Sequence, residues 1–170
     1  MNLLTLIVVL PLAGFLLNGL LGPRLGKPFV TVVGCGLPIL AFLATVRAFL
    51  QLNGAEGVAL VETAYTWAVV GDFTFDIAFY FDRLSAVMTL IITGVGSLIH
   101  VYSTGYMKDD ASYARYFSYL NLFLFFMLLL VLGRSLLVCF VGWAPSATPT
   151  SPLIPFTSEF RSNARAGKKA

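Results

Sequence analysis

The stretch LLTLIVVLPLAGFLLNGLL, residues Leu3 to Leu21, decides what kind of protein this is. It carries no charged side chain, and it is about as long as the helix of roughly 20 residues that crosses a hydrocarbon core of about 30 Å. Composition agrees, because 58% of the 170 residues are hydrophobic, 11% are charged and the mean hydropathy is +0.87. The sequence therefore predicts an integral membrane protein in contact with the lipid bilayer, with residues 3–21 as an uncleaved first span.

Further apolar runs follow along the chain. We expect complete spans at about 29–50, 84–102 and 116–132, and a fifth that begins at 135 and reaches only 143. Nine residues of helix measure roughly 13 Å at about 1.5 Å per residue, which is under half a bilayer. Four of the eight prolines then fall between Ala144 and Phe156, a density that no helix tolerates. The predicted organisation is an all-α polytopic region over 1–143, followed by a Pro-rich break and basic tail over 144–170.

A different period separates the second and third spans. Aromatic and β-branched residues alternate with smaller or polar ones on either side of Gly71 and Asp72. Period two with aromatic side chains indicates strands, and the Gly-Asp pair indicates a turn. We therefore expect a small surface β-hairpin over about 63–81. Asp82 then either caps the next helix or forms a charged relay with Arg83.

Charge sets orientation and excludes some functions. Lys and Arg number 11 against 8 Asp and Glu, and many of the cations lie in short connections, which reports topology and gives no support for nucleic-acid binding. With the N-terminus outside, the inner segments carry eight cations against three outside. The inner eight are Arg24, Lys27, Lys108, Arg115, Arg161, Arg165, Lys168 and Lys169, and the outer three are Arg47, Arg83 and Arg134.

The third span carries a polar stripe. Its members are spaced by three or four residues, which places them on one helical face; they are Ser85, Thr89, Thr93, Gly96, His100 and Ser103. One interpretation is a hydrated proton path with His100 as its titrating member and Thr93 and Thr89 beside it. The alternative is a packing face whose hydroxyls and glycine let helices approach closely.

Other polar residues favour structural roles. Asn18 and Asn121 are isolated amides within spans, where we expect them to bridge helices. Cys35 and Cys139 lie in apolar runs and suggest neither a disulfide nor a metal site. The sequence contains no phosphate loop, dinucleotide fingerprint or metal-ligand cluster, so we expect no catalytic, cofactor-binding or metal-binding residue.

Several segments together resemble a known family. They are Phe81 to Ser85, Thr93 to Ser103, Tyr106-Met107, Tyr113 to Asn121 and Gly142-Trp143. Over roughly Leu3 to Trp143 the chain is similar to subunit L of NADH-quinone oxidoreductase, respiratory complex I. The resemblance implies an antiporter-like bundle in a bacterial inner membrane, with its N-terminus outside and other membrane-arm subunits as partners. It also implies that NADH, FMN, iron–sulfur clusters and quinone are bound by other subunits while this one moves protons.

The resemblance also points to a loss. In that family, Gly-Trp precedes a proton-carrying glutamate, and the matching position here is Ala144. Family-like sequence returns after the Pro-rich block, which suggests a frame-shift-like break and an N-terminal fragment that is inactive alone. Two alternatives stay open: the large subunit of a multisubunit Na⁺/H⁺ antiporter, and a small membrane protein that transports nothing.

Overall fold

The computed structural model describes residues 2–54, 59–70, 73–108 and 112–143. Its helices are α1 (Leu3–Leu20), α2 (Gly22–Leu25), α3 (Lys27–Gly54), α4 (Arg83–Tyr106) and α5 (Tyr113–Leu132), and its strands are β1 (Leu60–Val70) and β2 (Phe73–Phe81). A short helical segment follows at 136–143. Helices α1, α3, α4 and α5 are each long and apolar enough to cross a membrane. The predicted class, an all-α membrane bundle with a small hairpin, is confirmed.

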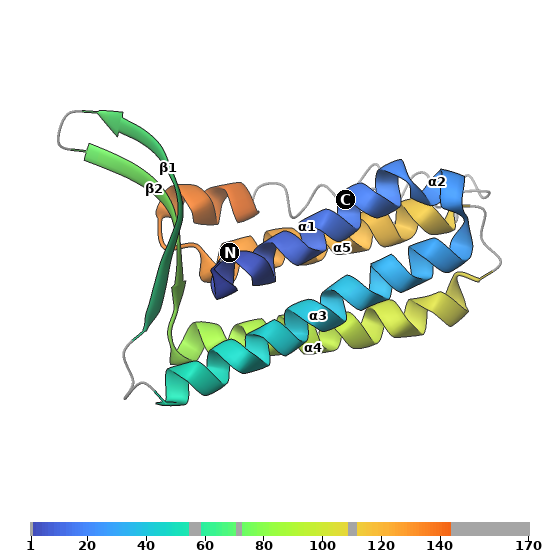
Figure 1. Cartoon of the computed structure of the whole chain (residues 1–170), viewed down its shortest axis with the longest axis horizontal. Coiled ribbons are helices and arrows are strands. Elements are labelled where there is room, and N and C mark those ends of the chain that lie inside the picture. The colour runs from blue at the N-terminus through green and yellow to red at the C-terminus, as the bar shows by residue number, and fades with distance from the viewer. Residues whose placement is uncertain (1, 55–58, 71–72, 109–111, 144–170) are drawn as a thin grey trace, which may run out of the picture.

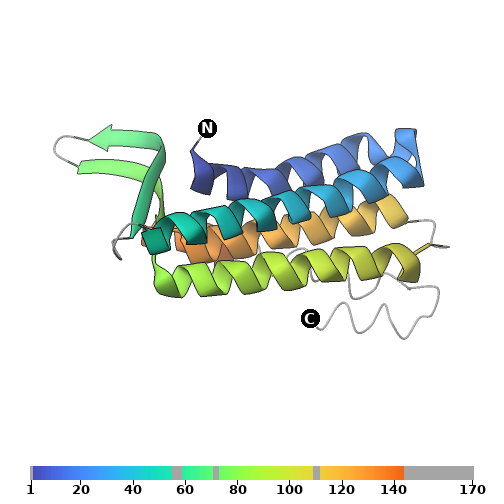
Figure 2. The same cartoon turned by 60° about the horizontal axis from the view of Figure 1, so that its bottom comes forward.

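The long helices run alternately up and down. Figures 1 and 2 show α1, α3, α4 and α5 lying side by side with their axes nearly parallel, the hairpin at one end and α2 at the other. Around the bundle, α1 packs on α5 and α3, α3 packs on α4, and α4 closes the ring on α5 less extensively. The positively charged residues Arg24, Lys27, Lys108 and Arg115 therefore lie at the end away from the hairpin, which we call the basic end.

Helices form here because a backbone in lipid must satisfy its own hydrogen bonds. Both α1 and α3 nevertheless contain a proline, at Pro11 and Pro38. A proline has no N–H to donate, so the carbonyl four residues earlier is left without its helical partner. Helix α3 also extends beyond the expected range of 29–50 at both ends. The predicted break at 144–170 lies outside the described residues.

The hairpin contacts the start of α1 and the residue that follows α5, both at its own end of the bundle. Its strands pair antiparallel from Leu60 opposite Phe81 to Val70 opposite Phe73, with two irregularities in register. The Glu62 carboxylate accepts hydrogen bonds from the backbone N–H groups of Leu3, Leu4 and Thr5 at 3.0, 2.8 and 3.3 Å. A strand residue thus satisfies donors that the start of α1 would leave unpaired.

Two apolar clusters fill the bundle. The larger lies toward the hairpin and includes Leu4, Ile7, Leu52, Phe81 and Leu128. The smaller lies toward the basic end and consists of Val30, Met107, Tyr113 and Phe117. Several buried polar side chains belong to neither cluster: Asn18, Thr45, Thr89, Thr93, Ser97, His100, Ser103, Ser118 and Asn121. The interior of the bundle therefore combines two apolar clusters with a separate set of buried polar side chains.

Candidate functional site

The inward face of α4 carries the polar stripe. Thr89, Thr93, His100 and Ser103 are all buried, whereas Ser85 and Gly96 are half-buried. Ser97 is also buried on this face, and the sequence interpretation missed it although it lies four residues after Thr93. The helix brings the three proposed proton-path residues, Thr89, Thr93 and His100, onto one protein-facing surface.

Two hydroxyls of this face bind their own helix, whereas Thr89 Oγ1 has no partner among the described residues. Thr93 Oγ1 donates to Thr89 O and Ser97 Oγ donates to Thr93 O, each at 2.7 Å. Such bonds to the carbonyl four residues earlier satisfy the hydroxyl proton without any other helix. Each oxygen keeps acceptor capacity, but the bonds by themselves are what a packing face needs.

His100 differs from Thr93 and Ser97 because one of its polar atoms has no hydrogen-bond partner among the described residues. It is only 1% exposed, and its Nδ1 lies 2.7 Å from Gly96 O. Because a carbonyl oxygen can only accept, Nδ1 carries a proton, and in the neutral ring Nε2 is an acceptor. Nε2 has no hydrogen-bond partner among the described residues. The Phe117 ring packs against the imidazole, with centroids 6.2 Å apart.

The surroundings of His100 are apolar. It lines a cavity of ≈ 220 Å³ between α4 and α5. We call this cavity the α4–α5 seam; it is bordered by Ile91, Val95 and Ile99 of α4 and by Leu120, Phe123 and Met127 of α5. Gly96 also lies here, where an added Cβ would be 3.0 Å from Leu124 Cδ1.

A polar layer at the basic end lies one turn beyond His100. Ser103 Oγ and the Tyr116 hydroxyl are 3.2 Å apart, and Thr31 Oγ1 and the Tyr113 hydroxyl are 2.7 Å apart. Lys27 Nζ donates to Lys108 O at 2.6 Å. These contacts tie α3, α4 and α5 together where they meet the basic connections.

The buried amides lie in a separate interface. Asn121 of α5 donates from Nδ2 to Gly34 O of α3 at 3.4 Å and to Phe117 O at 2.8 Å. Pro38 follows Gly34 by four residues and cannot donate to it, so Asn121 reaches a carbonyl that the proline leaves free. The expected bridging role of Asn121 is confirmed. Asn18 is fully buried, but its amide atoms have no partner among the described residues.

The capping alternative is confirmed for Asp82. Its side chain accepts from the backbone N–H of Ser85 at 2.7 Å. That hydrogen bond lowers the pKa of the Asp82 carboxyl below its ordinary value. Arg83 is the first residue of α4 and is exposed.

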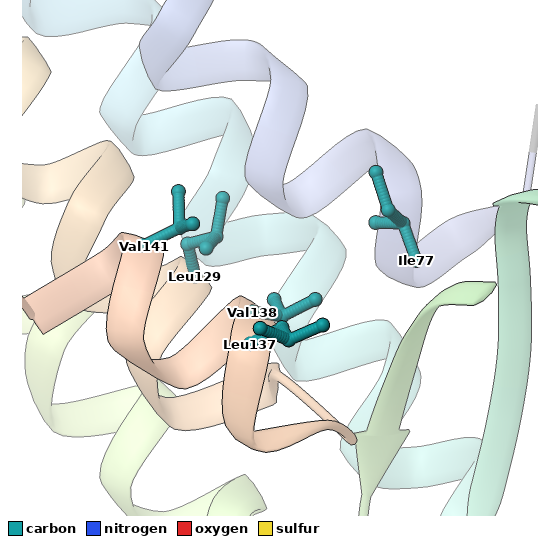
Figure 3. Close-up of a pocket in the computed structure, with 5 residues that line it drawn as sticks. All are labelled: Ile77, Leu129, Leu137, Val138 and Val141. Carbon is teal, nitrogen blue, oxygen red and sulfur yellow. The ribbon is translucent and has the colours of Figure 1, made fainter. Parts of the chain in front are cut away.

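Within the described residues, neither a second cavity nor the His, Cys, Asp and Glu side chains provide a further site. The second cavity, of ≈ 250 Å³, has an apolar lining. Its side chains, drawn in Figure 3, come from β2, α5 and the 136–143 segment: Ile77, Leu129, Leu137, Val138 and Val141. Within the described ranges, no three His, Cys, Asp or Glu side chains gather as a metal site requires. Ala144, the position of the family glutamate, lies outside those ranges.

Known proteins are similar to this chain in sequence and in fold. The family described as NADH-Ubiquinone oxidoreductase (complex I), chain 5 N-terminus, matches residues 67–117. NADH-quinone oxidoreductase subunit L of Pseudomonas aeruginosa is 37% identical over 172 residues, covering 100% of this chain. This chain is a relative of NADH-quinone oxidoreductase subunit L. The Escherichia coli and Mycobacterium tuberculosis subunits are 37% and 38% identical over 100% and 97% of the chain.

The subunit L relatives are much longer. This chain spans 28% of the Pseudomonas aeruginosa subunit and 26% of the Mycobacterium tuberculosis subunit. A chain in the structure of the membrane-bound sulfane sulfur reductase, an archaeal respiratory membrane complex, matches 99% of this chain with a TM-score of 0.82 at 18% identity. That match covers 33% of the archaeal chain. The bundle is thus a fold shared with part of larger respiratory membrane proteins.

Proposed function

We propose that this chain is the N-terminal helical region of a membrane-arm subunit that carries protons in a respiratory NADH:quinone oxidoreductase. The observation that carries the proposal is the relationship to subunit L over the whole chain. Four apolar helices surrounding buried polar side chains fit a protein that works within a membrane. NADH, FMN, iron–sulfur clusters and quinone would then be bound by partner subunits, and none by this chain.

Within this proposal, His100 is the residue best suited to exchange a proton, with Thr93 and Thr89 as neighbours on its helix. Its imidazole changes charge near neutral pH in water, and its Nε2 is free of protein partners among the described residues. A single imidazole is no relay across a membrane. The described chain therefore does not transport protons alone, and the loss of a carboxylate at Ala144 acts in the same direction.

A chimera tests the function. The matching part of Pseudomonas aeruginosa subunit L is replaced by residues 2–143 of this chain, and NADH-driven proton uptake is measured in vesicles. We expect a chimera that assembles, oxidises NADH and pumps. NADH oxidation without proton uptake would contradict the proposal. Isolated chain in liposomes should show no proton flux, and flux that disappears in His100→Ala would refute the inactive-alone part.

His100 is tested in the same vesicles. If His100 belongs to the proton path, His100→Gln lowers the number of protons moved per NADH while NADH oxidation remains. If His100 only packs, the substitution lowers the amount of assembled complex and leaves the ratio of protons to NADH unchanged. Thr93→Val and Thr89→Val, which keep the side-chain shape and remove the hydroxyl, extend the comparison along α4.

The proposed orientation places the N-terminus outside, in a bacterial inner membrane. It rests on the cations at the basic end, which positive-inside bias assigns to the cytoplasm. Cysteines replacing Arg24 and Arg115, in a background without Cys35 and Cys139, should be labelled only from the inner side. A cysteine replacing Arg83 should be labelled from the outer side, and the opposite pattern would overturn the topology.

A further inference from the structure

The basic end of the bundle carries positive charge that the described residues do not neutralise. Its four cations are exposed: Arg24, Lys27, Lys108 and Arg115. The described acidic residues lie at the other end, in the hairpin or at the start of α4: Glu62, Asp76 and Asp82. In the sequence, Asp109 and Asp110 follow Lys108, and they offset at most two of the four charges. A surface of this sign attracts anions.

A cavity of ≈ 170 Å³ lies at this end, between α2, α3 and α5. We call it the basic pocket; its lining includes Pro23, Gly26, Lys27, Tyr113 and Ala114. Figure 1 shows α2 at the end of the bundle opposite the hairpin. At about 30 Å³ per water molecule the pocket holds roughly five waters, which leaves room for a phosphate group. Unlike the α4–α5 seam, the basic pocket has a cationic side chain in its wall.

Lys27 is held in position at the wall of the basic pocket. Its Nζ donates to Lys108 O at 2.6 Å and lies 5.9 Å from the centroid of the Tyr113 ring. The Tyr113 hydroxyl is in turn 2.7 Å from Thr31 Oγ1. An ammonium group has three donors and Lys108 O accepts from one of them, so the positioned cation keeps donors for a ligand. A side chain that is already ordered loses less entropy on binding than a free one does.

The surroundings of the basic pocket indicate a lipid rather than a dissolved anion. Helices α1, α3 and α5 are each long and apolar enough to cross a membrane, so a pocket at their ends lies at the level of the headgroups. Leucines beside the pocket are exposed, Leu20 by 69% and Leu25 by 54%. Acyl chains cover such leucines, and basic pockets between membrane helices bind negatively charged headgroups. An anionic phospholipid supplies both parts, whereas a dissolved anion leaves the leucines uncovered.

We propose that the basic pocket binds the phosphate of an anionic phospholipid, with Lys27 Nζ donating to a phosphate oxygen and Leu20 and Leu25 beside the acyl chains. Arg24 and Arg115 are each next in sequence to a residue that lines the pocket, and they add to the attraction. The bond from Lys27 is charge-assisted and therefore stronger than a neutral hydrogen bond. In the orientation proposed above, the lipid belongs to the inner leaflet. This inference does not depend on proton transport.

Thiol protection in vesicles tests the occupant. The full chain, without Cys35 and Cys139, carries either Pro23→Cys in the pocket or the control Gly105→Cys, at the basic end but outside the pocket and with nothing within 4 Å of its added Cβ. N-ethylmaleimide is uncharged and labels both. With phosphatidylglycerol in place of phosphatidylcholine, labelling of Pro23→Cys should slow about fivefold when that lipid is at about four times its half-saturating level. Gly105→Cys should change little. Unslowed labelling of Pro23→Cys, or equal slowing of both variants, would overturn the proposal.

The role of Lys27 is tested against a second lysine of the same end. Lys27→Gln removes the cation from the pocket wall, and Lys108→Gln removes one that does not line the pocket. Lys27→Gln should raise the phosphatidylglycerol fraction that half-protects Pro23→Cys about tenfold, as expected for a lost charge-assisted hydrogen bond. Lys108→Gln loses only a screened surface attraction and should raise that fraction about twofold. Lys27→Arg should restore most of the protection. Equal effects of the two Gln variants would contradict a specific site.

Inorganic phosphate separates the lipid from a dissolved anion. Added to phosphatidylcholine vesicles, it should protect Pro23→Cys far less than phosphatidylglycerol does, because it has no acyl chains to place beside Leu20 and Leu25. Protection by inorganic phosphate as strong as protection by the lipid would show a site for free anions and would overturn the lipid assignment.

Discussion

Helix α5 contacts its neighbours in two different ways. Toward α1 and α3 it packs against glycines: a Cβ at Gly34 would lie 2.7 Å from the Phe117 ring, and one at Gly14 would lie 2.6 Å from Asn121 Oδ1. Toward α4 it leaves the apolar seam. Both interfaces bury a polar side chain, Asn121 in the first and His100 in the second. Of these two side chains, Asn121 has a partner on another helix, whereas His100 has none among the described residues.

The difference shows how close packing and polar pairing depend on each other in a membrane. Apolar surface alone does not drive helices together there, because lipid is equally apolar. Glycines bring the α3 backbone near α5, and Pro38 leaves a carbonyl that the Asn121 amide can reach. In the seam, no donor among the described residues pairs with His100 Nε2. The α1–α3–α5 interface is therefore closely packed and the seam loosely packed. Both hold buried polar atoms without a partner among the described residues: Asn18 Nδ2 and Oδ1 and Asn121 Oδ1 in the first, and His100 Nε2 in the second.

The largest expected effect comes from adding a methyl group to the closely packed interface between α3 and α5. Gly34→Ala should destabilise the bundle by about 1–3 kcal/mol, because its Cβ would fall against an aromatic ring that cannot move aside easily. Gly36→Ala is the matched control on the same helix, with nothing within 4 Å of its added Cβ. Unfolding in mixed micelles measures both. Equal stability of the two variants would break the contrast between interfaces.

The next largest loss of stability is expected when Asn121 no longer donates to the carbonyl that Pro38 leaves free. Asn121→Leu should cost about 0.6 kcal/mol, the average for polar contacts between membrane helices, and at most about 1.7 kcal/mol. In a Pro38→Ala background Gly34 O regains a helical donor, so the same substitution should cost less. A double-mutant cycle gives the coupling between the two positions. Full additivity would show that Asn121 does not serve the carbonyl that Pro38 frees.

The sequence predicted the parts of this structure that depend on local pattern. Apolar length gave the helices, period two gave the hairpin, and Asp82 three residues before Ser85 gave the α4 cap. It did not predict the cap of α1, because Glu62 lies 57 to 59 residues from the amides that it accepts from. Pro38 identifies Gly34 O as a free carbonyl, but only the packing of α3 on α5 identifies Asn121 as its donor. For His100 the spacing predicted the helical face, whereas the bond to Gly96 O and the unpaired Nε2 depend on the packing of α4 against α5.

The N-terminal cap of α4 stabilises the bundle, and this contribution to stability depends on pH. The Ser85 backbone N–H lowers the pKa of the Asp82 carboxyl in the folded protein. The resulting stability is fully present above the unfolded pKa of about 3.9 and is lost as the pH falls through the lower folded value. The cap is worth about 1 kcal/mol, and the ionisation-dependent part is smaller because the carboxylate is near solvent. Asn also caps helices but does not titrate, so Asp82→Asn should flatten the dependence of the unfolding free energy on pH across that range. An unchanged pH dependence would argue against the assignment of this effect to Asp82.

The smallest effect is expected at the seam. Gly96→Ala places a Cβ 3.0 Å from Leu124 Cδ1, the far end of a flexible side chain that can turn into the adjoining cavity. The gain from replacing a helical glycine, up to about 1 kcal/mol, offsets the small displacement, so stability should change by less than about 0.5 kcal/mol. The measurement is the same micelle unfolding used for Gly34→Ala, which keeps the two glycines directly comparable. A loss as large as that of Gly34→Ala would mean that α4 and α5 are as tightly fitted as α3 and α5, and the contrast between the two interfaces would fail.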